Sequence, residues 1–361
     1  MHSVPPLEQG LDTTPKAGDR PGPRARRTWR RWFRFSIRGL MILVLLACLG
    51  MGWAVHRAAL QRAAVMEIAK AGGSVKYDWQ SWGNGEPPTK APPPRWLVDL
   101  VGVDLLANVV EVFLGPRGTD AVLAHVAHLR HLRSLDVGGS RAVSDRGLRA
   151  LGELKELVTL DLQFTQITNR GMVHLKNLSL LQNLCLANTQ VGDQGMASLQ
   201  RLKSLEGLIL IRSQVGDTGL SYLEGLTRLQ DLRLDSTRVS DAGLIHLRGL
   251  SHLMFLDLSF TSVRGPGLAD LGTLPNLRTL NLDSTKVTDE GLTYLKRLTG
   301  LMFLNLDRTA VTDAGLLHLK GLTALDDLSV CATSVTESGA STLQRAHPDL
   351  MIEPWAFDQS P

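Results

Sequence analysis

Leucines recur along most of the chain at a fixed interval. Leu135 and Val112 occupy the same place in two early units whose lengths differ by single residues, and Ile352 occupies it near the C-terminus. A constant period of 20–50 residues indicates a stack of repeated structural units. From Leu160 onward the spacing is an unbroken 24 residues, at Leu160, Leu184, Leu208, Leu232, Leu256, Leu280, Leu304 and Leu328.

Each unit changes its hydrophobic period halfway through. Leu232 and Leu234 alternate with polar positions, which predicts a short strand. Leu244, Leu247 and Leu250 then return every third residue, which predicts a helical turn. A Ser-Asp or Thr-Asp pair comes before the helical half, and we expect its side chain to cap the free N–H groups there. One unit cannot bury its own leucines, so neighbouring units must stack to form a continuous core.

The unit L-x-x-L-x-L-x-x-T-x-V-T/S-D-x-G-L-x-x-L-x-x-L resembles the leucine-rich repeat. Its V-T-D-x-G-L signature and 24-residue period resemble the cysteine-containing subfamily, which is known from F-box adaptors and from many bacterial repeat proteins. The resemblance covers residues 108–352. It implies an α/β fold, a horseshoe-shaped solenoid with a parallel sheet on the concave face and helices on the convex face.

After each strand, where the subfamily has Cys or Asn, this chain has Thr or Ser. A hydroxyl group can both donate and accept a hydrogen bond, so we expect this column to bridge the turns of successive repeats. The role is structural, because buried turn backbone must be satisfied. The predicted ladder consists of Thr165, Thr189, Ser213, Thr237, Thr261, Thr285, Thr309 and Thr333.

The ends of the array need caps. Apolar residues of "RWLVDLVGVDLL" are expected to cover the first coil, and "MIEPWAF" is expected to close the stack after Pro348. The first set is Trp96, Leu97, Leu100, Leu105 and Leu106.

The N-terminal quarter has a different composition. Residues 1–28 are rich in Arg and Pro and are predicted to be a disordered tail. Residues 29–56 are predicted to form a transmembrane anchor with a basic and aromatic flank, and residues 57–94 a juxtamembrane helix, a short strand and a Pro-rich linker. The repeat domain with its caps is assigned to residues 95–361. Gly72 and Gly73 are expected to end the juxtamembrane helix.

No residue between Gly39 and Val55 is charged, and this stretch is at the short end of the ~17–25 residues that span a bilayer. Lipid contact is therefore assigned to residues 39–55. A cleaved signal peptide, a lipidated Cys48 and a buried soluble helix are the alternatives. The order of an Arg-rich tail, an apolar span and repeats also resembles bacterial membrane-anchored repeat proteins of unassigned role.

The formal net charge of +4 comes from the N-terminal arginines, without which the chain is slightly acidic. Arginines before the apolar stretch place the N-terminus in the cytoplasm and the repeats outside it, as a single-pass membrane protein. Trp32 and Phe33 beside the arginines favour a membrane flank over a nucleic-acid patch, so no nucleic-acid partner is predicted.

Residues between the strand leucines are expected to face outward on the concave sheet. Apolar groups and aspartates gather there, and aspartates outnumber arginines, which favours a basic or amine-bearing partner. Scattered apolar residues and solvated aspartates on a repeat surface are the alternative explanation. The candidate contacts are Ile209, Ile211, Arg233, Asp235, Phe255, Asp257, Phe260, Asp283, Phe303 and Asp307.

Other chemistry is not indicated. The spacing of His125, His128 and His131 suggests a metal site, but all three fall at outward positions with no recurring carboxylate or cysteine. Cys185 and Cys331 are about six repeats apart, too far to form a disulfide. The chain lacks a phosphate-binding loop, a nucleophile elbow and a paired-carboxylate motif. We predict no catalytic residue, metal or cofactor.

The sequence therefore favours a membrane-anchored receptor or scaffold that binds a protein or peptide and is not an enzyme. A structural or adhesive envelope protein without a dedicated ligand is the alternative. A substrate adaptor for protein ubiquitination follows only from the subfamily resemblance, and the chain has no recognisable F-box. The pattern makes no prediction of oligomeric state.

Overall fold

The computed structural model describes residues 37–80 and 90–353. The chain divides into two units, Met1–Trp53 and Ala54–Pro361. Of the first unit, residues 37–53 are described; they form the start of helix α1 (Ile37–Lys70), and none of them is buried. Within the described part of the chain, α1 is the helix that is long and apolar enough to cross a membrane, with a mean hydropathy of 2.0 over its most apolar 18 residues. The tail assigned to residues 1–28 and the aromatic flank lie outside the described residues.

The second unit contains one sheet in which the strands follow chain order. Strand β1 (Ser74–Tyr77) pairs antiparallel with β2 (Val109–Phe113), and every later strand is parallel to its neighbour. The later strands are β3 (Ser134–Asp136), β4 (Thr159–Asp161), β5 (Asn183–Cys185), β6 (Gly207–Ile209), β7 (Asp231–Arg233), β8 (Phe255–Asp257), β9 (Thr279–Asn281), β10 (Phe303–Asn305), β11 (Asp327–Ser329) and β12 (Met351–Glu353).

Equivalent leucines pair in register across this sheet. Leu160 lies opposite Leu184, and Leu256 opposite Leu280. The pairing extends to Val112 at one end and Ile352 at the other. The strand positions predicted from leucine spacing are confirmed, including the strand at Met351–Glu353.

The helical half of each repeat is short. Twenty-four residues that also hold a strand and two turns leave room for one or two helical turns, many of them with the tighter 3₁₀ geometry. The α-helices are α2 (Arg95–Val101), α3 (Val103–Leu106), α4 (Asp120–Val126), α5 (Asp145–Leu151), α6 (Asp193–Met196), α7 (Asp217–Ser221), α8 (Leu268–Leu271), α9 (Asp289–Leu292), α10 (Asp313–Leu316) and α11 (Glu337–Gln344). The 3₁₀ segments are η2 (Gly115–Arg117), η3 (Gly171–His174), η4 (Ala197–Arg201), η5 (Asp241–Leu247), η6 (Thr293–Arg297) and η7 (Leu317–Gly321).

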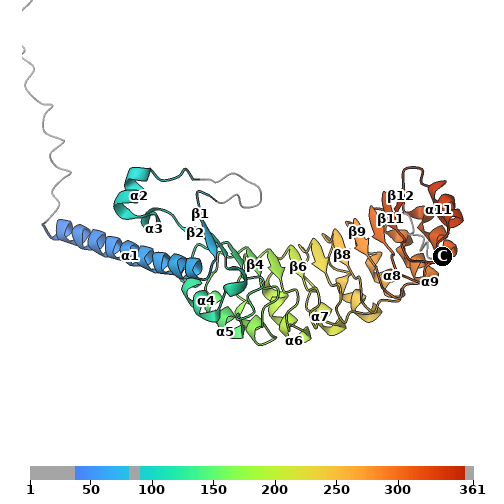
Figure 1. The fold of residues 1–361 in the computed structure, drawn as a ribbon, viewed down its shortest axis with the longest axis horizontal. Coiled ribbons are helices and arrows are strands. Elements are labelled where there is room, and N and C mark those ends of the chain that lie inside the picture. The colour runs from blue at the N-terminus through green and yellow to red at the C-terminus, as the bar shows by residue number, and fades with distance from the viewer. Residues whose placement is uncertain (1–36, 81–89, 354–361) are drawn as a thin grey trace, which may run out of the picture. The chain divides into compact units, whose positions relative to one another are not determined.

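The core lies between the sheet and the helical segments, which occupy opposite sides of the repeats (Figure 1). Leu256 of β8 and Leu258 just after it enter the core from the sheet side, and Leu244 and Leu247 enter it from η5; all four are fully buried. A fully buried leucine contributes about 1.5–3 kcal/mol of transfer free energy. Because this contribution recurs in every repeat, stacking alone accounts for the continuous core.

The first repeat is capped by α1 and β1. Ala58, Gln61, Ala64 and Ile68 form one buried stripe of α1, and Ala64 and Ile68 join the core. Gly72, at a φ of 80°, follows the end of the helix as predicted.

The cap expected from Trp96 and Leu100 is wrong. Helix α2, which carries both residues, has no buried side chain. The sequence pattern of "RWLVDL" is apolar enough for a cap, but the adjoining core is already covered by Ile68 and by Val75 of β1.

The helix starts are joined from repeat to repeat by aspartates. Asp217 accepts hydrogen bonds from the backbone N–H (2.8 Å) and the hydroxyl (2.6 Å) of Ser240 in the next repeat. Asp289 binds Thr312 in the same way. The predicted capping by Ser and Thr is confirmed where Ser240 accepts from Ala242 N–H at 3.4 Å. The aspartate that follows each cap, whose role the sequence did not suggest, makes the link between repeats.

A glycine leaves space for each aspartate. A Cβ atom on Gly243 would lie 2.5 Å from Asp217 Oδ1, closer than any real contact. The glycine at this position therefore packs against the preceding repeat's carboxylate.

Asn169 replaces the aspartate in one repeat and still accepts from the next repeat, at Gly192 N–H, whereas at Gly265 the side-chain acceptor is missing. Asp241 still accepts from the backbone N–H groups of Gly265 (3.0 Å) and Gly267 (2.9 Å). In that repeat Gly265 takes the place of the aspartate, and Thr288 in the next repeat makes no side-chain cap. Gly265, at a φ of 136°, packs against Gly291 instead.

Candidate binding surface on the sheet

The outer face of the sheet presents the side chains on either side of each buried leucine. Phe255 and Asp257 flank Leu256, and both are half-buried while the leucine has no exposed surface. The same pattern recurs in most strands, so the predicted alternation is confirmed. The sheet therefore supplies an ordered surface on which side-chain columns lie about 4.8 Å apart.

The candidate contacts all come from this surface or from the turn after it. Phe260 is exposed, and one residue, Asp283, is buried. The rest are half-buried, namely Ile209, Ile211, Arg233, Asp235, Phe255, Asp257, Phe303 and Asp307.

Arg233 covers one of the phenylalanines. Its guanidinium lies 4.9 Å from the centre of the Phe255 ring on the neighbouring strand, and its Nη2 lies 3.0 Å from Asp231 Oδ2. A cation over an aromatic face is stabilised by the ring's quadrupole. These three residues form a preassembled polar and aromatic group at the middle of the sheet.

Arg308 makes a second group of the same kind. Its guanidinium lies 5.6 Å from the centre of the Phe260 ring, pairs with Asp283, and donates from Nε to Ser284 Oγ at 2.8 Å. The placement of Asp283 as an outward-facing contact is wrong: it is only 7% exposed, because Arg308 reaches back and covers its carboxylate.

Phe260 and Arg308 share a backbone feature that the sequence analysis missed. The residue before each ladder Thr or Ser has a left-handed backbone, with φ between 51° and 57° in eight non-glycine residues. Gly139 occupies the same column, and Asn188 and Ser236 are residue types that favour turns. These residue types are a signal in the sequence from which the left-handed position could have been predicted. The eight residues are Phe164, Asn188, Arg212, Ser236, Phe260, Ser284, Arg308 and Ala332.

Aspartates at or just after the strand ends accept hydrogen bonds from the turns. Asp257 Oδ1 accepts from the backbone N–H of Ser259 at 2.9 Å, and Asp161 Oδ1 accepts from that of Gln163 at 2.8 Å. Asp307 Oδ1 accepts from Ser329 Oγ (2.6 Å) and from Cys331 N–H (2.7 Å). In each of these aspartates the Oδ1 atom stabilises a turn by accepting a hydrogen bond. The aspartates are therefore more than solvated surface charges.

Asp235 faces a neighbouring carboxylate. Burial, and after it the negative charge of Asp257, raise the pKa of Asp235 above its usual value. Because the charge of Asp257 disfavours the ionised form of Asp235, a cation beside Asp235 would be bound favourably.

The Thr and Ser ladder is buried but makes different bonds from those predicted. Thr237 Oγ1 donates to Leu234 O at 2.6 Å, and Thr261 Oγ1 donates to Leu258 O in the same way. Each of these bonds closes a turn inside one repeat, so the bridging of successive repeats expected from this column is wrong for the threonines. Ser140, which occupies the same column in an earlier repeat, does bridge, because its hydroxyl donates to Gly115 O of the preceding repeat. The ladder from Thr165 to Thr309 is buried, and Thr333 is half-buried.

Histidines, cysteines and carboxylates are the remaining candidates for chemistry. Among the described residues, no three His, Cys, Asp or Glu side chains are grouped so as to hold a metal ion. His131 contacts Glu156 across one repeat, at 3.1 Å. Cys185, on β5, is half-buried, and burial raises the pKa of its thiol to about 12, so it is a poor nucleophile.

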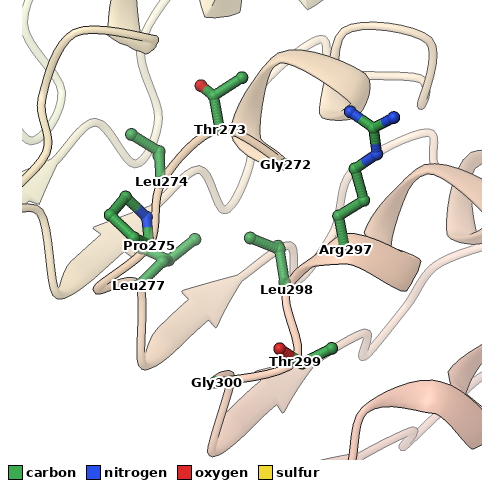
Figure 2. Close-up of a pocket in the computed structure, with 9 residues that line it drawn as sticks. All are labelled: Gly272, Thr273, Leu274, Pro275, Leu277, Arg297, Leu298, Thr299 and Gly300. Carbon is green, nitrogen blue, oxygen red and sulfur yellow. The ribbon is translucent and has the colours of Figure 1, made fainter.

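A pocket of about 330 Å³ lies away from the sheet face, between the loops that follow α8 and η6 (Figure 2). It adjoins the junction at which the side-chain acceptor is missing, at Gly265. Arg297 is the charged residue in its lining, and Thr273 donates to Asp270 O at 2.8 Å. No acid–base or nucleophile–base pair lines it, so it offers no catalytic arrangement.

Comparison with known proteins gives the family. A model of the leucine-rich repeat region matches residues 117–296. No curated protein matches the chain.

Solved structures resemble the chain at low identity. Internalin C2 from Listeria monocytogenes is 26% identical, over 61% of this chain and 84% of that one, with a TM-score of 0.47. The internalin InlF from the same organism is 19% identical, over 72% and 85%, with a TM-score of 0.50. Mouse RP105, in complex with MD-1, is 21% identical, over 64% and 39%, with a TM-score of 0.52.

The 24-residue period, the parallel in-register sheet and the matching region agree with one another. InlF and RP105 share the fold of this chain. The chain therefore belongs to the leucine-rich repeat proteins.

Proposed function

We propose that the protein is a membrane-anchored binding module whose sheet face holds a protein or peptide. The observation that carries the proposal is the gathering of Phe255, Phe260 and Phe303 with Ile209 and Ile211 on the outer face of one sheet and the turns that follow its strands. Aromatic and aliphatic groups on an ordered surface are typical anchors for a partner. A preformed sheet also limits the entropy lost on binding.

The charges on the surface favour a partner with a basic group. The charges of Arg233 and Arg308 are already paired with those of Asp231 and Asp283. The pKa of Asp235, in contrast, is raised by burial and by the negative charge of Asp257. A Lys or Arg of the partner near Asp235 would relieve that repulsion. Mouse RP105, which has the same fold, is itself found in complex with a protein, MD-1.

Helix α1 supports the anchor. Its uncharged stretch from Gly39 to Val55 is exposed almost throughout and has the hydropathy of a bilayer span. We propose that α1 remains in the membrane with the N-terminus in the cytoplasm and the repeats outside. Protease treatment of intact cells tests this orientation, because a repeat domain protected from the protease would reverse it.

The binding surface is tested by exchanging Phe255 and Phe303 for serine in the full chain and identifying proteins captured from an envelope extract. Met254 and Met302 supply matched controls, because each precedes one of these phenylalanines, is similarly apolar and is exposed outside the strand. We expect partners to be lost with the phenylalanine variant and kept with the methionine variant. Equal capture by both variants would show that the sheet face is not the binding surface.

A further inference from the structure

Helix α2 has an apolar face that nothing in the described structure covers. Trp96 is 68% exposed and Leu100 is 73% exposed. Four residues separate them, so both lie on the same side of the helix. Leu97 and Val98, on the other side, are half-buried. The repeat array is already capped by Ile68, so Trp96 and Leu100 are not needed for its core.

Helices α2 and α3 are held at one position along α1, beside Gln61 and Arg62. Asp104 of α3 is only 5% exposed and accepts from Gln61 Nε2 at 3.2 Å and from Tyr77 Oη at 3.2 Å. Arg62 Nε lies 3.3 Å from the second oxygen of the same carboxylate. Gly102, between α2 and α3, packs against Arg62. These contacts hold α2 beside the part of α1 that follows the apolar stretch.

That position along α1 lies at the outer edge of the headgroup layer of a bilayer. The uncharged stretch ends at Val55, and Gln61 is six residues further on, which is about 9 Å along a helix axis. Each headgroup layer is roughly 5–8 Å thick outside the hydrocarbon core. Helix α2 lies on the side of the second unit that faces away from the repeats (Figure 1).

We propose that Trp96 and Leu100 rest in the headgroup layer of the membrane that α1 crosses, so that α2 is an interfacial contact. This rests on the proposed anchor. Tryptophan and leucine are the residues that short amphipathic helices place in that layer. Arg95 is exposed at the start of α2, where a lipid phosphate would pair with it, and Asp99 is exposed on the same helix, which limits the depth of insertion.

The attachment of α2 to α1 makes such a small apolar surface sufficient for contact with the membrane. A seven-residue helix with two apolar groups would bind membranes weakly by itself. Because α2 is held beside α1, it meets the bilayer at a high effective concentration. Each contact of α2 with the lipid then helps to orient the second unit relative to the membrane.

Tryptophan quenching in the full chain separates this inference from the anchor. The protein is reconstituted into liposomes of phosphatidylcholine and phosphatidylglycerol, with and without bromine near the headgroup end of the acyl chains. The chain has seven tryptophans, so Trp96→Phe and Trp53→Phe variants are compared with the parent to isolate each residue's emission. Trp53 lies in the apolar stretch of α1 and reports the anchor. The exposure of Trp96 makes its exchange harmless to folding.

We expect the emission of Trp53 and of Trp96 both to be largely lost in brominated liposomes. Quenching of Trp53 without quenching of Trp96 overturns the interfacial contact and leaves the anchor in place. Absence of quenching at Trp53 overturns the anchor and the contact together. A Trp96 signal that is shielded from acrylamide yet unaffected by bromine shows that protein covers this face, which also overturns the proposal.

Discussion

Asp217 and Ser240 belong to consecutive repeats, and both oxygens of the aspartate accept hydrogen bonds from the serine, one from its backbone and one from its hydroxyl. The serine in turn caps the next helical segment. A single carboxylate thus joins the start of one helical segment to the next, and the same arrangement recurs at Asp120, Asp145, Asp289 and Asp313.

Asp217→Ala should destabilise the protein. It leaves the N–H and hydroxyl of Ser240 without their partner, and the loss of such a part-buried, charge-assisted bond costs about 1–3 kcal/mol. Urea unfolding of the full chain in detergent, followed by circular dichroism, measures the change. Glu153→Ala, at an exposed position, is the control and should change the free energy of unfolding by less than about 0.5 kcal/mol. Equal effects of the two substitutions would contradict the role of the aspartate chain.

Gly243→Ala should also destabilise the protein, because the new methyl group would lie 2.5 Å from Asp217 Oδ1 and 3.0 Å from Leu220 Cδ1. Overpacking of this kind costs about 1–3 kcal/mol. Gly249→Ala is a matched control in the same repeat, since nothing lies within 4 Å of its Cβ position. Thermal unfolding of both variants checks the difference, and a Gly243→Ala midpoint equal to that of Gly249→Ala would show that the space beside the carboxylate is not needed.

Ile68→Ala should lower the free energy of unfolding by about 2–5 kcal/mol, as expected for a fully buried aliphatic side chain at the cap. Trp96→Ala should change it by less than about 0.5 kcal/mol, because that side chain is mostly exposed. Hydrogen exchange at β2 and β3 offers a local measurement of the same effect. Faster exchange in the Trp96 variant than in the Ile68 variant would reverse the assignment of the cap.

Asp235→Asn should stabilise the protein at neutral pH. The pKa of Asp235 is raised in the folded chain by burial and by Asp257, so its ionised form opposes folding above the unfolded pKa. That penalty fades as the pH falls through the folded pKa and is absent below the ordinary aspartate value of about 3.9. The free energy of unfolding of both proteins, measured at pH 7 and near pH 3, should therefore differ only at pH 7. A gain of the same size at both pH values would show that charge is not its cause.

The leucine period was sufficient to predict the architecture. Leu160 and its equivalents pair in register because every strand needs the same buried position, and a strict period leaves one way to stack the units. The candidate surface was predictable to the same degree, since Phe255 and Asp257 must point outward when Leu256 points inward.

The errors came from contacts that a one-dimensional pattern does not contain. Arg308 covers Asp283 from the next repeat, which no spacing within one unit reveals. The hydroxyl of Thr237 can bond within its repeat or between repeats, and only the turn geometry decides between them. Trp96 and Ile68 are both apolar residues near the first coil, and the path of α1 determines which of them reaches the core.

The interruption at Gly265 has a consequence for cooperativity. In a linear array, each repeat is stabilised by its immediate neighbours, so the coupling energy at every junction decides how far an opening spreads. Where glycine replaces the aspartate, the junction between the repeats that contain α8 and α9 loses a carboxylate link that most other junctions have. Partial unfolding from the C-terminal end should therefore halt there, so that residues after Gly265 open as one block while the preceding repeats stay folded.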